Sequence, residues 1–327
     1  MFQAALISGW HVHADGYARE FAAIPGCKIA AVYDEDAARG RSLAQKLDCP
    51  YYDTPEAALS APGVRGGILT SPTNEHPRLL ALMAKSGKHI FTEKVLTTRC
   101  SEALEAKAAI EKSGVTFAIS FPHLSRAALR AAKEIVDAGR LGRVTYARVR
   151  NVHDGAVAGW LPGHFYDRDA CGGGAMIDLG AHPMYTLSWL LGSPVSVQSL
   201  FTSVTEKPVE DNAVCLLSFE NGAIGVSETG FVSRGNPYTL EVSGTEGSLL
   251  VRGSQLSVCD KSTGMEWQSV ENLPADRPSP LRLWAEAVQS GSAVPEELGI
   301  DAAVRLSAIM DAAYTAHRSA REEKVQR

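Results

Sequence analysis

The sequence predicts two domains: a doubly wound α/β domain with a parallel sheet, and an α+β domain with an open, mainly antiparallel sheet. The chain has 327 residues, more than one small core requires. Up to about residue 120, short apolar runs alternate with segments of helical periodicity, which is typical of a parallel sheet covered by helices. Beyond residue 124, apolar residues recur at every second position, as in strands with one exposed face.

Strands are expected in the first part where apolar character is continuous, because both faces of such strands are covered. These runs are Ala4–Ser8, Lys28–Tyr33, Gly66–Thr70, Lys88–Thr92 and Thr116–Ser120. The intervening segments predict helices at Tyr17–Ala23, Glu35–Leu47, Pro55–Leu59, Glu75–Lys85 and Ser101–Lys112. Gly87 and Gly114 stand where C-terminal helix caps are expected.

The second part begins with a predicted helix at Ala127–Ala138. Period-two patterns then predict strands at Arg143–His153, Val195–Thr205, Ala213–Phe219, Ala223–Val232, Thr239–Ser243 and Ser248–Arg252. Amphipathic helices are expected at Leu281–Gln289 and Asp301–Arg318, and a frayed tail at Arg321–Arg327. We therefore expect domains at residues 1–122 and 123–327, with C-terminal helices that can pack back on the first domain.

Composition excludes several functional classes. Hydrophobic residues make up 45% and charged residues 21%, as in globular proteins. A net charge of −5 without any Lys/Arg cluster argues against nucleic-acid binding. No apolar run approaches the roughly 20 residues of a membrane span, and the first nine residues lack the basic start of a secretory signal. The sequence therefore predicts a cytoplasmic protein.

The six cysteines show no spacing typical of a zinc site or a disulfide framework. They are scattered, without a Cys-x-x-Cys pair or a nearby pair of histidines. We expect reduced thiols and no metal.

The turn after the first predicted strand resembles a phosphate-binding turn. The residues Gly9-Trp10-His11-Val12-His13-Ala14 fit the G-x-G-x-x-G/A pattern at Gly9 and Ala14, but His11 replaces the second glycine. Such a turn places a dinucleotide pyrophosphate at a helix N-terminus. By itself this match is weak, and an ordinary strand–helix turn remains an alternative.

Asp34 strengthens the case for a dinucleotide. It ends the second strand, where an acid can hold the ribose 2′-hydroxyl. Glu35 and Asp36 follow, without an adjacent base to balance a 2′-phosphate, so NAD is favoured over NADP. The alternative role for Asp34 is an N-cap of the next helix.

A third segment follows a strand and opens a helix. Contacts with the ribose and nicotinamide are expected from Thr70, Ser71, Pro72, Asn74 and His76. The alternative is a capping segment, in which Thr73 or Asn74 satisfies the first helical amides.

Two further runs carry candidate catalytic residues. One runs from Gly87 to Glu93 and Lys94, and the other from Gly172 to Asp178 and His182. A lysine, an acid and a histidine supply a cation, an orienting group and a proton acceptor, which proton and hydride movement at a carbinol requires. The alternatives are a surface salt bridge for the lysine, a cap or ion pair for the acid, and a structural histidine.

The geometry of the second run depends on Pro183. On a continuous helix, Asp178 lies one turn before His182 and shares its face. Pro183 removes a helical amide, so the helix can also break and restart there.

Substrate contacts are expected from residues beside the glycine run and after the last parallel strand. These are His123, Trp160, His164, Tyr166 and Arg168. Aromatic faces with polar edges suit a sugar, although a surface for a protein partner has a similar composition.

With these motifs in this order, the chain resembles the Gfo/Idh/MocA family of NAD(P)-dependent oxidoreductases over nearly its whole length. The resemblance rests on the segments above together with Trp189–Gly192. It implies a Rossmann domain, and sugars, inositols or related polyols as substrates. Lys94 would contact the reacting hydroxyl with Glu93 helping to place it, Asp178 would be the acid and His182 the catalytic histidine. Val95 replaces the proline that follows the lysine in the family, and His11 the second glycine.

We therefore expect an NAD-dependent dehydrogenase acting on a sugar or polyol. Two alternatives remain: a lyase or glycosidase that retains NAD and oxidises its substrate transiently, and a sensor that binds without turnover. A homodimer or homotetramer is expected through the open sheet, where Val214, Leu216, Ser218 and Val226 would be exposed.

Overall fold

The computed structural model describes residues 1–235 and 238–326. The chain divides into two compact units. The first contains residues 1–120 and 278–307, and the second residues 121–277 and 308–327. The predicted domain boundary between residues 122 and 123 stays a prediction.

The first unit contains a parallel sheet of six strands in the order β3-β2-β1-β4-β5-β6. The strands are β1 (Phe2–Ile7), β2 (Cys27–Tyr33), β3 (Tyr51–Tyr52), β4 (Val64–Leu69), β5 (His89–Thr92) and β6 (Phe117–Ile119). All five predicted strands are present. The sequence analysis missed β3, because two residues are too few to form a pattern.

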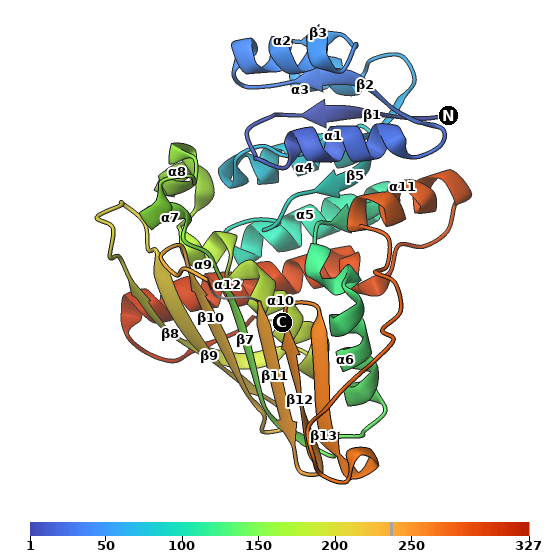
Figure 1. Ribbon diagram of the computed structural model, residues 1–327. Helices are drawn as coiled ribbons and strands as arrows, with labels where there is room; N and C mark the ends of the chain where they lie inside the picture. The colour runs from blue at the N-terminus through green and yellow to red at the C-terminus, as the bar shows by residue number, and fades with distance from the viewer. Residues whose placement is uncertain (236–237, 327) are drawn as a thin grey trace. The chain divides into compact units, whose positions relative to one another are not determined.

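Helices cover this sheet in two groups, with α1 packing against α11 and α4 against α5 (Figure 1). The helices are α1 (Ala14–Ala23), α2 (Ala37–Lys46), α3 (Pro55–Leu59), η1 (Thr73–Glu75), α4 (His76–Lys85), α5 (Cys100–Ser113), α11 (Pro280–Ser290) and η5 (Glu296–Leu298). Gly114 caps α5 with a φ of 65°, as predicted. The N-cap of α2 is Asp36, not Asp34, because the Asp36 carboxylate accepts the amides of Ala38 and Arg39.

The core of the first unit includes residues from both of its chain segments. Trp284 of α11 is fully buried and lies against Phe2, Phe21 and Phe91, with ring centroids 5.1, 6.0 and 5.9 Å away. Such aromatic contacts contribute beyond their buried area. The segment 278–307 therefore completes the hydrophobic core of the parallel-sheet unit.

The second unit contains a sheet of nine strands in the order β14-β13-β12-β11-β7-β10-β9-β8-β15. The strands are β7 (Val144–Val152), β8 (Pro194–Thr202), β9 (Asn212–Phe219), β10 (Ile224–Gly230), β11 (Thr239–Gly244), β12 (Gly247–Arg252), β13 (Gln255–Asp260), β14 (Gln268–Ser269) and β15 (Glu323–Lys324). β7 and β10 pair in parallel, whereas the other neighbouring strands of this sheet, within the described residues, pair antiparallel. The predicted mainly antiparallel sheet is confirmed.

The prediction of a frayed C-terminal tail was wrong for the described residues. Glu323 and Lys324 form β15 on β8, and the Val325 amide donates to the Val195 carbonyl at 3.0 Å. Val325 is buried. Backbone pairing holds this segment, which side-chain pattern does not reveal. Arg327 lies outside the described residues.

Helices of the second unit connect the strands and cover one face of the sheet, with α10 packing on β7 and β10. They are η2 (Pro122–Ser125), α6 (Ala127–Asp137), α7 (Gly155–Ala158), η3 (Gly163–Tyr166), α8 (Arg168–Cys171), α9 (Ala175–Asp178), α10 (Ala181–Leu191) and η4 (Lys261–Thr263). The last long helix, α12 (Ile300–Ser319), continues from residues of the first unit into the second.

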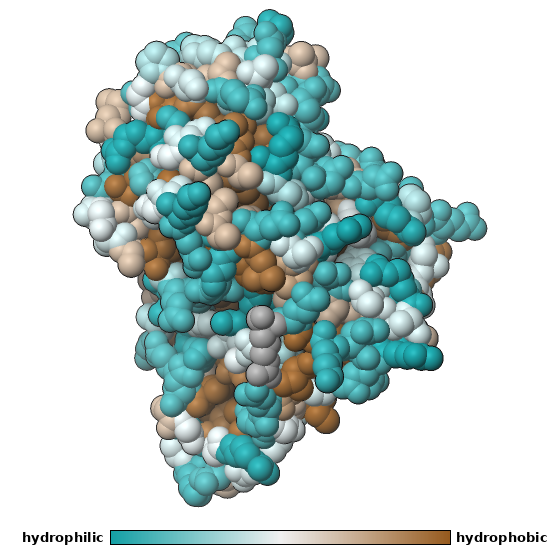
Figure 2. Space-filling model, turned by 180° about the vertical axis from the view of Figure 1, so that it is seen from behind, coloured by the Kyte–Doolittle hydropathy of each residue, from teal (hydrophilic) through white to brown (hydrophobic). Residues whose placement is uncertain are grey.

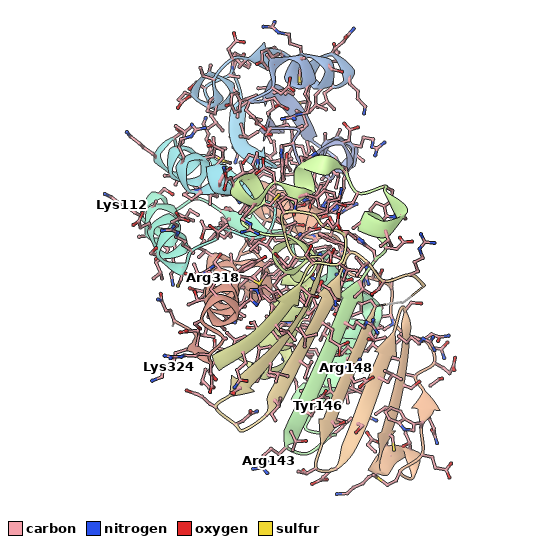
Figure 3. All side chains as sticks on the ribbon, turned by 90° about the vertical axis from the view of Figure 1, so that its left-hand side faces the viewer. Lys112, Arg143, Tyr146, Arg148, Arg318 and Lys324 are labelled. Atoms are coloured by element: carbon pink, nitrogen blue, oxygen red, sulfur yellow. The ribbon has the colours of Figure 1, made fainter. Side chains whose placement is uncertain are left out.

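The other sheet face carries both ion pairs and exposed apolar residues. Arg148 on β7 (Figure 3) binds Glu228 through Nη2 at 2.9 Å. Val214, Leu216 and Ser218 are exposed on β9, as predicted. Val226 was predicted exposed but is buried: it pairs in register with Arg148 and Leu216, whose larger side chains flank it.

Hydrophilic residues cover most of the face shown in Figure 2, where apolar residues form small groups. Within the described residues, no helix combines the length and apolar character needed to cross a membrane.

Candidate active site

The carboxyl ends of β1 and β4 hold the predicted cofactor segments beside each other. The His11 amide donates to the Thr70 carbonyl at 3.0 Å, and the Thr70 hydroxyl donates to the Ser8 carbonyl at 2.5 Å. Ser8, which the sequence analysis did not single out, has a φ of 74° and turns the chain after β1. The turn with Trp10 and the half-exposed Val12 thus lies next to the Thr70–His76 segment.

Asp34 links the end of β2 to this turn. Its carboxylate accepts the Gly9 amide at 2.8 Å and binds Arg39 through Nε at 2.9 Å and Nη2 at 2.6 Å. Arg39 was not predicted, because it lies five residues beyond Asp34 and only the helix of α2 brings it back to that carboxylate. Asp34 thus lies at the predicted place at the end of β2. Arg39 forms a bidentate ion pair with its carboxylate.

Glu93 is a buried centre of contacts at the end of β5. Its carboxylate lies 2.7 Å from His13 Nδ1 and 3.7 Å from His11 Nδ1, and accepts a hydrogen bond from the Tyr17 hydroxyl. Burial by itself would raise the pKa of Glu93, but the charges of His11, His13 and Lys94 outweigh it and hold the pKa well below its usual range. His13 and Tyr17 were missed, although their i,i+4 spacing at the start of a helix places them on one face.

Lys94 follows Glu93 and is buried, and the peptide bond from Lys94 to Val95 is cis. His76 holds the next residues: its Nδ1 lies 3.0 Å from the Val95 carbonyl and 3.1 Å from the Leu96 carbonyl. Burial lowers the pKa of His76, which favours a neutral ring. The structure thus gives His76 a role in positioning this segment, and its contact with a cofactor stays a prediction.

The capping alternative for the Thr70–His76 segment was wrong. The N-caps are Pro72 for η1 and Glu75 for α4, and neither makes a side-chain capping bond. The Ser71 hydroxyl donates to the Pro72 carbonyl at 3.2 Å, and Asn74 lies within η1. The predicted cofactor contacts of these residues stay predictions.

In the second unit, His182 lies in the first turn of α10 and is buried. Its Nδ1 is 2.8 Å from the Tyr185 hydroxyl, and its ring stacks on His123 with centroids 4.4 Å apart. The His123 amide also donates to the Tyr185 hydroxyl, at 3.2 Å. His123, predicted near the substrate, is therefore placed directly against the predicted catalytic histidine.

The helix carrying Asp178 and His182 breaks between them. α9 ends at Asp178 and α10 begins at Ala181, so the second of the two predicted geometries is correct. Pro183 lies in the first turn of α10. Backbone amides in a first turn have no acceptor within the helix, so the proline costs no helical hydrogen bond there. Burial lowers the pKa of His153 and the Asp178 charge opposes this, which identifies His153 as a neighbour that the sequence analysis missed.

Glycines before α9 allow other segments to approach the backbone closely. A Cβ on Gly173 would lie 1.9 Å from the Tyr314 hydroxyl oxygen, and one on Gly174 would lie 2.1 Å from the Glu210 carbonyl oxygen. The Glu210 carboxylate accepts the amides of Gly174 at 2.9 Å and Met176 at 3.0 Å. These contacts fix the start of the short helix that carries Asp178.

The other predicted substrate residues lie in the loop before this run. Trp160 is exposed, donates to Asp154 at 3.0 Å and lies beside the His153 ring. Tyr166 is buried against Phe231, and His164 is half-buried.

Arg168 donates to the Pro208 carbonyl and lines a pocket of about 360 Å³ with Lys207, Glu210 and Arg318. Arg318 is labelled in Figure 3. His123 is thus placed against His182, whereas Trp160 contacts His153 and Arg168 lines this separate pocket.

Family models match most of the chain. Residues 5–121 match an oxidoreductase family with an NAD-binding Rossmann fold, and residues 129–250 match the GFO/IDH/MocA C-terminal domain. The chain belongs to the GFO/IDH/MocA family of oxidoreductases. The predicted family, fold class and NAD-dependent oxidoreductase class are confirmed.

Curated relatives include scyllo-inositol 2-dehydrogenase (NAD(+)) of Bacillus subtilis (strain 168), 29% identical over 70% of this chain and 67% of that protein. Another is 1,5-anhydro-D-fructose reductase of Ensifer adhaerens, 29% identical over 69% of each chain. A solved structure of levoglucosan dehydrogenase in complex with NADH and levoglucosan aligns over 100% of both chains with a TM-score of 0.88. At 18% identity, that likeness shows the fold alone.

Proposed function

We propose that this oxidoreductase transfers a hydride between NAD and a hydroxyl or keto carbon of a sugar, inositol or related polyol. The observation that carries the proposal is the buried Lys94 at the carboxyl end of β5 in the NAD-binding unit. Ligands of parallel α/β sheets bind at this edge. The names of the curated relatives, an inositol dehydrogenase and an anhydrofructose reductase, support the substrate class.

The first unit offers a fitting set of groups for the cofactor. The turn from Gly9 to Ala14 precedes α1, whose N-terminal amides suit a pyrophosphate. The Asp34 carboxylate next to the Gly9 amide suits a ribose hydroxyl and disfavours a 2′-phosphate. Bound nicotinamide supplies or accepts the hydride.

Lys94, His182, Asp178 and His123 keep their predicted roles in the proposed reaction. In this proposal, the Lys94 ammonium stabilises negative charge on the reacting oxygen. His182 takes or returns the hydroxyl proton through Nε2, because the Tyr185 hydroxyl holds Nδ1. Asp178 orients the substrate, and His123 contacts it beside His182.

We also propose a cytoplasmic homodimer or homotetramer. Exposed Leu200, Val214, Leu216 and Ile224 on β8, β9 and β10 support association through the open sheet face. Six cysteines without a disulfide suit a reducing compartment. Sedimentation of the purified protein would determine the assembly.

A panel of inositols, anhydrosugars and glucosides, each with NAD or NADP, tests the function. Formation of NADH in a one-to-one ratio with oxidised product supports the proposal. Cleaved or dehydrated product without net NADH would instead indicate a lyase or glycosidase that retains NAD. Binding of both ligands without turnover would indicate a sensor, and either result would overturn the dehydrogenase assignment.

A further inference from the structure

Two histidines and a glutamate of the first unit converge at the turn between β1 and α1. His11, His13 and Glu93 each offer one ligand atom, and these atoms lie within 4.8 Å of one another. We propose that these three residues bind a divalent transition metal of the zinc type, and that the metal competes with NAD. The competition rests on the proposed function, whereas the metal site itself does not.

The donor set is one that zinc prefers. Two imidazole nitrogens and a carboxylate oxygen form a three-ligand site that leaves a fourth position for water. Zinc bonds of about 2.1 Å at tetrahedral angles separate ligand atoms by about 3.4 Å. Glu93 Oε1 lies 2.7 Å from His13 Nδ1 and 3.7 Å from His11 Nδ1, which brackets this separation. Small side-chain movements are therefore enough to admit an ion.

Neighbouring groups hold the ligands in place. The His13 amide donates to His11 Nδ1, and this hydrogen bond must break before that nitrogen can bind an ion. Glu93 is held through both oxygens, because the Tyr17 hydroxyl donates to Oε1 and the Lys94 amide to Oε2. Ser120 hydrogen-bonds Tyr17 at 2.7 Å and fixes its hydroxyl in turn. Outer partners of this kind orient metal ligands and raise their affinity.

The cluster combines burial with access. Glu93 and His11 are 2% and 7% exposed, whereas the His13 side chain is 49% exposed and gives an ion a path from solvent. The adjacent Lys94 ammonium opposes a second cation. We therefore expect weaker binding than at a closed four-ligand structural site.

The expected competition between the metal ion and NAD follows from the position of the two histidine ligands. His11 and His13 belong to the turn that we assign to the cofactor pyrophosphate, and His11 stands where the family has a glycine. A metal held by both rings would occupy the space that the pyrophosphate needs. Because coupling between two ligands is reciprocal, NAD would weaken metal binding by the same factor.

This proposal departs from the prediction that no metal is bound. That prediction considered cysteine spacing. Glu93 is 80 residues from His13 in the chain, so tertiary structure alone brings them together.

The test uses the untagged full-length protein after removal of metals by a chelator. Zn²⁺ is titrated in competition with a chromophoric chelator, and Co²⁺ is titrated while its visible absorption reports tetrahedral coordination. The His13→Ala and Glu93→Gln variants remove ligands. The Tyr17→Phe variant removes an outer partner, and His89→Ala is a matched control on the same unit. Circular dichroism establishes that each variant is folded.

We expect binding of one Zn²⁺ per chain and loss of more than about 100-fold in affinity for His13→Ala and Glu93→Gln. Tyr17→Phe should lose about 10- to 100-fold, the usual effect of an outer partner, and His89→Ala should be unchanged. No binding by the parent protein, or equal binding by parent and His13→Ala, would overturn the site. If Glu93→Gln does not fold, His13→Ala still tests the site, because His13 is half-exposed and its replacement should leave the fold intact.

Competition is measured by titrating NAD into the protein at several Zn²⁺ concentrations. The apparent Kd for NAD should rise in proportion to Zn²⁺ once the metal site fills. An NAD affinity that Zn²⁺ leaves unchanged or improves would overturn the competition. NAD that fails to bind the metal-free protein would count against the proposed function instead, and the two failures are thereby distinguished.

Discussion

The imidazole rings of His123 and His182 stack with centroids 4.4 Å apart and planes inclined by 17°. Both residues also contact one hydroxyl: the Tyr185 oxygen is 2.8 Å from the ring nitrogen Nδ1 of His182 and 3.2 Å from the backbone amide nitrogen of His123. A buried ring held in this way keeps one orientation. Tyr185 is therefore a positioning residue for the proposed proton acceptor.

Replacing Tyr185 by Phe should lower kcat by about 5- to 12-fold, since one hydrogen bond contributes about 1 to 1.5 kcal/mol. The phenyl ring keeps the stack on Phe121, whose centroid is 4.2 Å away, so folding should persist. The imidazolium form of His182 loses an acceptor, so the acid limb of the kcat/KM profile should move to lower pH. An unchanged profile would contradict the positioning role.

Replacing Lys94 by Ala should lower kcat by about 10²- to 10³-fold, because the reacting oxygen loses its cation. Replacing His182 by Asn should lower it by about 10²- to 10⁴-fold. Steady-state NADH formation measures both effects. Lys112 (Figure 3) is an exposed lysine of α5, and Lys112→Ala is the control expected to retain activity. Full activity of Lys94→Ala would reject the catalytic assignment.

Replacing Asp34 by Ser should shift cofactor preference toward NADP. The change removes the acid that suits a ribose hydroxyl, and it breaks both hydrogen bonds from Arg39 to Asp34, so that Arg39 keeps its contact with Glu35 through Nη2 while Nε can turn to a 2′-phosphate. Since a hydrogen bond to a charged group contributes about 1.5 to 3 kcal/mol, the ratio of the Kd values should change by about 10-fold or more. Calorimetric titration measures both constants.

The matched control for that experiment is Asp36→Ser, two residues further along. Asp36 accepts the backbone amides of Ala38 and Arg39, whereas the Arg39 side chain binds Asp34, so replacement of Asp36 should preserve the preference for NAD. An equal shift in both variants would show that the effect comes from α2 as a whole and not from Asp34.

Replacing Gly174 by Ala should destabilise the protein by about 1 to 3 kcal/mol, the usual cost of overpacking. The new Cβ would lie 2.1 Å from the Glu210 carbonyl oxygen, so α9 and Asp178 must shift. Denaturant unfolding measures the loss. Gly163→Ala is the control, because a Cβ there meets nothing within 4 Å. Similar stability of the two variants would refute the close approach.

Sequence reasoning predicted the regular elements of the first unit well, because continuous apolar runs and caps are local signals. The helix Pro55–Leu59 was predicted to the residue, and Gly114 caps α5 as expected. Elements without such a signal were missed. β15 is held by backbone pairing of polar residues, and its existence depends on β8 lying alongside it.

Only the residues of the candidate site that lie in short sequence motifs were predicted. Lys94, Asp178 and His182 were predicted from short runs of chain, and their catalytic roles stay predictions. Arg39, His153 and Tyr185 were not predicted, because their roles depend on contacts with other residues. The exposure of Val226 was misjudged for a related reason, since strand alternation assigns a face but does not show which neighbours cover it.

By itself, the sequence determined the family, the two kinds of sheet and the types of chemical group available, because apolar periodicity and motif order are written along the chain. Tertiary structure alone decided which groups meet. Glu93 reaches Tyr17 across 76 residues, and His123 reaches Tyr185 across 62. Side-chain contacts over such separations arise from packing of whole elements, and no local pattern records them.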